Sequence, residues 1–185
     1  MLVAILVAEV LFWVVLATGL AVRYLAGRER LSTWVLRGVP LVDLALVALV
    51  AVDIAAGAPP SREHAVAAVY LGFTVAFGRA TIAWADSRFR HWFSGGPRPH
   101  KPAKGSREEV RALWREWFRV LLAAALASAL LLGMVAAEGS PLPGSLQEAA
   151  LHPYWSMMQL LGIITVIWFL AGPAFAGPGR RTHPD

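Results

Sequence analysis

The sequence predicts an all-α integral membrane protein: a helical bundle of five transmembrane helices with one cytoplasmic interfacial amphipathic helix. Hydrophobic residues make up 57% of the 185-residue chain and charged residues 16%, and the mean hydropathy is +0.57. The apolar residues also come in blocks, five of which approach the roughly 20 residues that a helix needs to cross the hydrocarbon core. We therefore expect a single membrane domain over residues 1–185.

The predicted membrane helices cover residues 2–22, 39–56, 65–85, 120–137 and 154–175. The first has the position of a signal peptide, but no basic segment precedes it and Glu9 lies within it. The connection before the third helix is short and contains Pro59 and Pro60, so the second and third helices should be antiparallel neighbours. The third carries a stripe of small residues, which we expect to pack inside the chain rather than against a second copy: Ala68, Gly72, Ala76 and Ala80.

Residues 86–119 are predicted to form a cytoplasmic loop that ends in the amphipathic helix. Ser106 and Glu109 have capping-box spacing, and apolar residues then recur at helical intervals. Two interpretations of this segment stay open. It is the interfacial start of the fourth membrane helix, or it recognises anionic lipid head groups through five side chains: Arg107, Arg111, Trp114, Arg115 and Trp117.

The 17 basic residues indicate the orientation. All except Arg62 and Arg79 fall in the segments that follow the first, third and fifth helices. By the positive-inside rule, the N-terminus lies outside and the C-terminus is cytoplasmic. Nucleic acid is not an expected partner, because half of the arginine-bearing helix is tryptophan-rich and no recognition fold accompanies it.

One group of ionisable residues is predicted near the outer surface. Charge at bilayer depth costs about 2.5–3.5 kcal/mol per residue, so such groups must be paired, hydrated or functional. Asp53 is expected about 6 Å deep and Glu9 about 10 Å deep, and His64 begins the next helix on the same side. These three can converge, near Glu138 and His152, on a pocket for a divalent metal ion or for protons. The alternative interpretation is that these residues only satisfy one another structurally. No metal-binding motif accompanies them, so the sequence identifies no metal, and we expect no cofactor.

A second group is predicted near the cytoplasmic side. Asp43 is expected about 6 Å and Arg79 about 10 Å from that end of neighbouring helices, where an ion pair would relieve both charges. Asp86 follows Arg79 on nearly the same helical face and can attract the guanidinium. We expect a structural clasp, and the alternative is an ion or anion path through Arg79.

Scattered positions of the sequence match a known pattern. They are Glu9 with Phe12-Trp13, Arg23-Tyr24, Pro40 with Asp43, Asp53 with His64, Tyr70-Leu71-Gly72, Phe77-Gly78, Trp84-Ala85-Asp86 with Arg88-Phe89, and Gly95-Gly96. Over roughly residues 1–135 the chain resembles the YmcC-like small multi-pass membrane proteins of Gram-positive bacteria. The resemblance implies a protein of the bacterial cytoplasmic membrane and supplies no mechanism. It also implies a histidine after Gly78, where this chain has Arg79.

Two functions stay open after these observations. The favoured one is a non-enzymatic accessory or scaffold subunit that docks on a membrane protein partner or on a second copy. The alternative is a transporter or channel for a proton, metal ion or small solute that enters at Glu9, Asp53 and His64; the absence of an inverted repeat disfavours it. We do not expect an enzyme, because no catalytic motif is present, and the enzymatic alternative is chemistry on lipid head groups.

Overall fold

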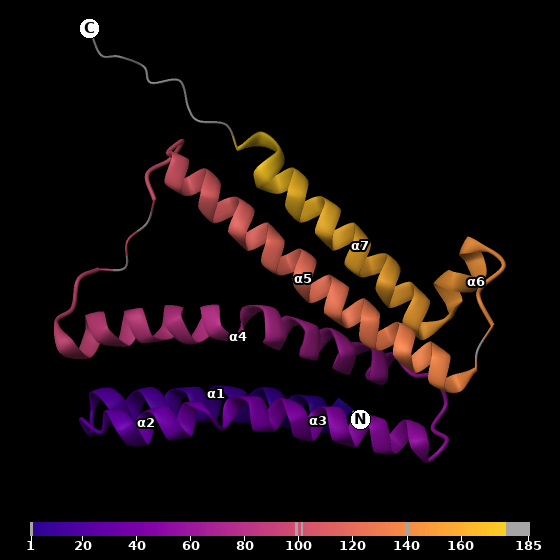
Figure 1. Cartoon of the computed structure of the whole chain (residues 1–185), viewed down its shortest axis with the longest axis horizontal. Coiled ribbons are helices and arrows are strands. Elements are labelled where there is room, and N and C mark those ends of the chain that lie inside the picture. Colours follow the sequence, from indigo (N-terminus) through magenta and orange to yellow (C-terminus); the bar gives the residue numbers. More distant parts are fainter. Residues whose placement is uncertain (1, 99, 101, 140, 177–185) are drawn as a thin grey trace, which may run out of the picture.

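The computed structural model describes residues 2–98, 100, 102–139 and 141–176. The described residues form helices and no strands, which confirms the all-α class. The elements are shown in Figure 1: α1 Leu2–Tyr24, α2 Glu29–Leu36, α3 Val39–Ala55, α4 Arg62–Ser94, α5 Arg107–Glu138, α6 Leu146–Leu151, α7 Pro153–Ala171 and the 3-10 turn η1 Pro173–Phe175.

Four helices in the described part of the chain are long and apolar enough to cross a membrane: α1 from Leu6, α4, α5, and α7 with η1. The second predicted crossing corresponds to α3, which at 17 residues is shorter than these four helices. α2 lies in line with α3 and extends it (Figure 1). Neither α2 nor α6 was predicted from the sequence.

Two predicted boundaries differ from the structure. α4 continues past residue 85 to Ser94, and Gly95 ends it in the left-handed conformation with φ 62°, which glycine adopts without strain. The predicted amphipathic helix and the fourth membrane helix are one continuous helix, α5. It begins where the Ser106 hydroxyl accepts a hydrogen bond from the Glu109 N–H, at 3.1 Å, which is the capping arrangement that the sequence indicates.

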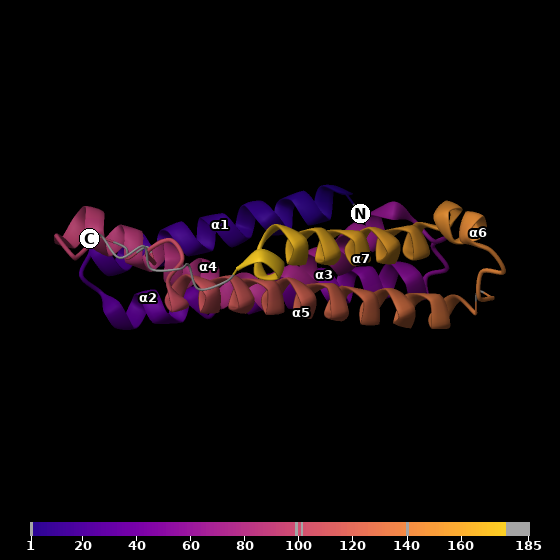
Figure 2. The same cartoon turned by 90° about the horizontal axis from the view of Figure 1, so that it is seen from above.

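The helices form two layers on either side of α4. α1, α2 and α3 pack together along one side, while α5 and α7 pair on the other (Figure 1). α5 packs across the first half of α4 and leads away from its second half (Figure 1). Seen from above, the helices share one long direction, and the molecule is much longer than it is wide (Figure 2).

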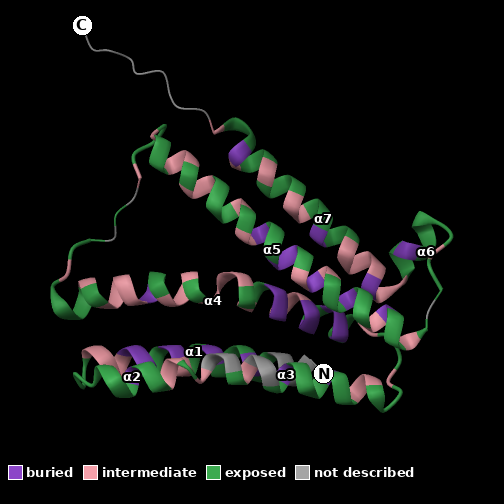
Figure 3. Cartoon of the chain, viewed as in Figure 1, coloured by how far each residue is buried: buried purple, intermediate pink, exposed green. Residues whose placement is uncertain are grey.

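α4 and α5 pack closely against each other. A Cβ added at Gly72 would lie 2.5 Å from the backbone oxygen of Ala123, and Ala68 is fully buried beside Ala127. The first two residues of the small-residue stripe, Ala68 and Gly72, therefore pack inside the chain, as predicted, whereas Ala76 and Ala80 are only partly buried. Burial concentrates on the first half of α4 and on the faces of α5 and α7 around it, whereas the outward faces are exposed (Figure 3), as expected for helices that meet lipid.

Candidate functional site

His64 is the centre of a buried polar cluster. It lies in the first turn of α4, because Ser61 caps this helix and its hydroxyl accepts a hydrogen bond from the His64 N–H at 3.2 Å. The His64 side chain is only 2% exposed. Its Nε2 lies 2.8 Å from Oδ2 of Asp53 on α3, and its Nδ1 lies 3.3 Å from the hydroxyl of Tyr154 on α7.

Tyr154 is held in place by the start of its own helix. His152 caps α7, since its Nδ1 accepts a hydrogen bond from the Tyr154 N–H at 3.2 Å. The Tyr154 side chain is fully buried, and its hydroxyl also hydrogen-bonds to Glu138 at the end of α5. Four helices, α3, α4, α5 and α7, thus meet in one polar group, which we name the His64 cluster: Asp53, His64, Glu138 and Tyr154.

The hydrogen bonds of the His64 cluster fix how protons can be arranged in it. When both carboxylates are ionised, they only accept hydrogen bonds, so Nε2–H must donate to Asp53 and the tyrosine O–H must donate to Glu138. Nδ1 of His64 lies within hydrogen-bond distance of the same tyrosine oxygen, and the tautomer of the ring decides whether it donates or accepts. The cluster is therefore a continuous hydrogen-bonded chain from Asp53, whose side chain is 42% exposed, to Glu138.

Glu9 lies outside the His64 cluster. It lines a separate hollow between α1 and α4 with Tyr70 and Thr74. Among the described residues, no three histidine, aspartate or glutamate side chains lie close enough together to hold a metal ion. The structure therefore brings Asp53 and His64 together, as the short connection between their helices indicates, and it keeps Glu9 apart from them.

A second polar cluster lies near the other end of α4, around Asp86. Its Oδ1 accepts hydrogen bonds from the hydroxyl of Tyr24 at 2.8 Å and from Nη1 of Arg23 at 3.3 Å, and its Oδ2 accepts one from Nη2 of Arg90 at 2.8 Å. These four residues form the Asp86 cluster, which ties α1 to α4.

Arg79 is not among the partners of Asp86, in contrast to the expectation from their spacing. It is an exposed residue of α4 about two turns away, whereas Arg90 is one turn from Asp86 and α1 brings Arg23 alongside. The side chain of Asp43 lies outside the described residues, so its ion pair with Arg79 stays a prediction.

The arginines and tryptophans at the start of α5 have different surroundings. The indole N–H of Trp117 donates a hydrogen bond to the backbone oxygen of Thr165 on α7 at 3.2 Å, and both Trp114 and Trp117 pack against the ring of Phe169. The tryptophans therefore join α5 to α7. In contrast, the three predicted lipid-binding arginines are exposed: Arg107, Arg111 and Arg115.

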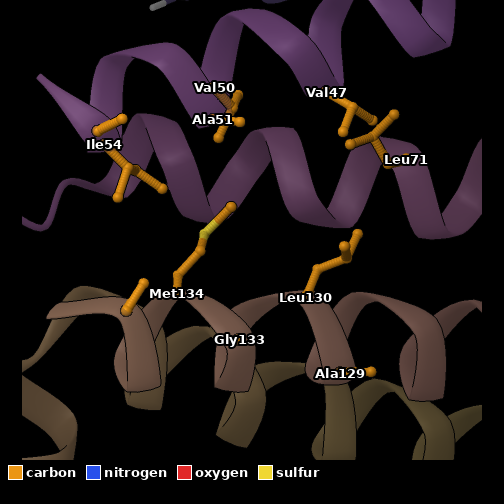
Figure 4. Close-up of a pocket in the computed structure, with 11 residues that line it drawn as sticks. Val47, Val50, Ala51, Ile54, Leu71, Ala129, Leu130, Gly133 and Met134 are labelled. Carbon is orange, nitrogen blue, oxygen red and sulfur yellow. The ribbon is translucent and has the colours of Figure 1, made fainter. Parts of the chain in front are cut away.

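A cavity of about 620 Å³ lies between α3, α4 and α5 (Figure 4). Every residue that lines it is apolar, and most of them are exposed, so it is a groove on the surface of the molecule. A Cβ added at Gly133 would meet nothing within 4 Å. We name this the apolar groove, and its lining is Val47, Val50, Ala51, Ile54, Ala55, Leu71, Ala129, Leu130, Gly133, Met134 and Ala137.

Helices of membrane-spanning length, polar clusters towards their ends and a largely apolar exposed surface define a multi-pass α-helical membrane protein. The chain is 37% identical over 128 residues to the "Uncharacterized membrane protein YmcC" of Bacillus subtilis strain 168, which covers 69% of this chain and 68% of that protein. It therefore belongs to the YmcC-like family of membrane proteins. No family model matches the sequence, and no solved structure matches the fold.

Proposed function

We propose that the protein is a non-enzymatic accessory or scaffold subunit of a membrane complex. The observation that carries this proposal is the apolar groove, which the residues that the structure describes leave unfilled. In lipid, helices associate through close packing at small residues rather than through a hydrophobic driving force. The groove offers such residues on both walls, with Ala51 and Ala55 on α3 and with Ala129, Gly133 and Ala137 on α5.

The two polar clusters support a structural role over transport. Each joins different helices through side chains of the same chain. His64 and Asp86 are separated by about 33 Å along α4 at 1.5 Å per residue, which is similar to the roughly 30 Å of the hydrocarbon core. Two separate polar clusters at this spacing are better explained as structural contacts at the two membrane boundaries than as parts of one continuous transport path.

We further propose five crossings of the bacterial cytoplasmic membrane, with the N-terminus outside and the C-terminus cytoplasmic. α1 and α4 run in the same direction, because Ala8 packs with Ala67 at one end while Tyr24 bonds to Asp86 at the other. The chain must return between them, and α2 with α3 supplies that crossing (Figure 1). Reporters fused at Pro60 and Lys104 test the orientation, and an external Lys104 would overturn it.

Anionic lipid head groups are proposed as a further partner. The exposed side chains of Arg107, Arg111 and Arg115 lie next to the tryptophans that join α5 to α7. Basic and aromatic residues together are typical of a membrane interface with anionic lipids.

Photo-crosslinking in cells tests the accessory role. A benzophenone amino acid in place of Gly133 would project into the apolar groove, and the same amino acid in place of Leu132 would be exposed on an adjoining part of α5. We expect one discrete protein adduct from position 133 and none from position 132. The partner identified in that adduct should, when it is purified itself, bring this protein with it. Lipid adducts alone at both positions would contradict the proposal.

A proton transporter or channel is the second candidate, favoured by the hydrogen-bonded chain from Asp53 to Glu138. A relay of this kind can pass a proton between its two ends without moving the helices. It requires a proton pathway onward from Glu138 to the opposite surface, whereas an accessory role requires none.

A further inference from the structure

Glu9 is a carboxylate on a part of α1 long and apolar enough to cross a membrane. Glu9 is exposed, and it lines a hollow of about 190 Å³ between α1 and α4. Within the described part of the chain, Glu9 makes no hydrogen bond and no ion pair, in contrast to Asp53 and Asp86. An ionisable group at bilayer depth normally has a partner or faces water.

The walls of the hollow are suited to a positive charge. Aromatic residues line the hollow together with Glu9 from both helices, with Phe12 and Trp13 on α1 and with Phe73 and Phe77 stacked 5.6 Å apart on α4. The faces of such rings attract cations. A carboxylate among aromatic rings therefore selects an ammonium or guanidinium group over a neutral or negative one.

The size and position of the hollow restrict the source of that cation. Small-molecule pockets usually measure roughly 300–1,000 Å³ and enclose most of their ligand, whereas this hollow is smaller and lies on an exposed face. It accommodates the end of one long side chain. A group that reaches it from within the bilayer is most simply carried there by another membrane-spanning helix.

We propose that this hollow receives the lysine or arginine side chain of a partner's transmembrane helix, which forms an ion pair with Glu9. The proposal rests on the accessory role and names the chemistry of the partner. It concerns a different face from the apolar groove, because the hollow lies between α1 and α4 and the groove lies between α3, α4 and α5.

Arg79 of a second copy is the competing source of the charge. It is exposed on α4, one residue beyond Gly78 of the hollow, so its side chain projects from an adjoining face. α1 and α4 run in register such that Ala8 packs with Ala67 and Tyr24 bonds to Asp86. Arg79 therefore lies about 12–17 Å from the level of Glu9 along the helices. In a two-fold pair of copies the two groups stay at these different depths.

A designed helix tests the proposal directly. The chain has no cysteine, so Ser94→Cys places a single fluorophore at the end of α4. The labelled full chain is reconstituted in phosphatidylcholine vesicles with a leucine–alanine transmembrane peptide that carries one central lysine and an acceptor dye. The same peptide with glutamine instead of lysine is the reference. Energy transfer should report about tenfold tighter association of the lysine peptide, as expected for one polar interaction within a bilayer.

The variants separate the ion pair from unspecific association. Glu9→Gln should remove the preference for the lysine peptide. Glu9→Asp should keep part of it, and Glu116→Gln, which changes an exposed glutamate of α5, should leave it unchanged. Equal association of both peptides with the unaltered protein would overturn the proposal, as would a preference that survives Glu9→Gln.

Two further results would also overturn it. If the unaltered protein associates with itself and Arg79→Gln abolishes this while the lysine peptide does not bind, the occupant is a second copy. If dodecyltrimethylammonium displaces the lysine peptide and itself binds in a Glu9-dependent manner, the occupant is an amphiphilic amine. Failure of crosslinking at Gly133 would count against the accessory role alone, since the peptide experiment measures a different face.

Discussion

Nδ1 of His64 lies 3.3 Å from the hydroxyl of Tyr154, although ninety residues separate them in the chain. The contact connects the first turn of α4 to the first turn of α7. Because His64 also bonds to Asp53 and Tyr154 to Glu138, this one pair links both layers of the molecule.

Replacing the tyrosine should therefore destabilise the fold. Tyr154→Phe keeps the ring but leaves Nδ1 of a buried imidazole without its partner, which costs about 1–3 kcal/mol in the free energy of unfolding. Chemical unfolding in mild detergent measures this. His64→Ala should cost less in the Tyr154→Phe background than in the unaltered protein, with a coupling of about 0.5–3 kcal/mol.

An exposed polar pair that also involves a histidine provides the control. Nε2 of His100 lies 3.4 Å from Oε2 of Glu108, and both side chains are mostly exposed. Glu108→Gln should change the free energy of unfolding by less than about 0.5 kcal/mol. An equal effect of Glu108→Gln and Tyr154→Phe would contradict the importance of burial at the His64 cluster.

Gly72→Ala should weaken the seam between α4 and α5. The new Cβ would lie 2.5 Å from the Ala123 backbone oxygen and 2.9 Å from the Ala127 nitrogen, and backbone atoms cannot move aside without shifting a helix. Overpacking of this kind typically costs about 1–3 kcal/mol. Gly133→Ala is the matched control on α5, since nothing lies within 4 Å of its added Cβ. Helix propensity favours alanine at both positions, so Gly133→Ala should not lower the melting temperature, and an equal decrease in both variants would contradict the packing argument.

Some of these contacts could be predicted from the sequence. Asp53 and His64 flank a connection so short that their helices must be neighbours. Because each residue lies within about one helical turn of that connection, both side chains must lie at a similar depth in the membrane. The small-residue stripe likewise indicated close packing. Tyr154 was missed because a hydrophobic pattern gives neither the rotation of α7 nor its neighbours, and no motif marks a tyrosine that follows a helix cap.

The remaining differences have physical causes of the same kind. Hydropathy marks where a chain leaves the hydrocarbon core, whereas a helix ends where its backbone is capped, so α4 continues to Gly95. Spacing along one helix suggested that Asp86 attracts Arg79, but α1 supplies Arg23 and Tyr24 from a contact that no local pattern reveals. Glu9 shares its side of the membrane with His64 in the predicted topology, yet it belongs to another face of the bundle.

The Asp86 cluster should contribute measurably to stability. Asp86→Asn removes a charge that accepts hydrogen bonds from Arg23, Tyr24 and Arg90. Because the Asp86 side chain is only 15% exposed, we expect a loss of about 1–3 kcal/mol on unfolding. Glu116→Gln, at an exposed position of α5, serves as the control. Similar unfolding curves for the two variants would mean that solvent already screens the Asp86 cluster.

The proposed lipid contact predicts a dependence on lipid charge. Phosphatidylglycerol should raise the melting temperature of the unaltered protein in nanodiscs relative to phosphatidylcholine. The double variant Arg111→Gln and Arg115→Gln should lose most of this difference, since each basic group near an anionic surface contributes about 1 kcal/mol. Arg62→Gln changes an arginine at the start of α4, on the other side of the membrane in the proposed topology, and should retain the effect of phosphatidylglycerol on the melting temperature. A loss of the same size in Arg62→Gln would argue against a contact specific to α5.

The most direct test of the accessory role compares stability with flux at the His64 cluster. The unaltered protein, Asp53→Asn and His64→Ala are reconstituted in vesicles under an imposed proton or divalent-metal gradient, and their unfolding is followed in parallel. The account predicts that both variants unfold at lower temperature and that all three proteins leave the gradient at the rate of empty vesicles. A gradient that collapses with the unaltered protein but persists with a variant of unchanged melting temperature would contradict it and make the cluster part of a transport path.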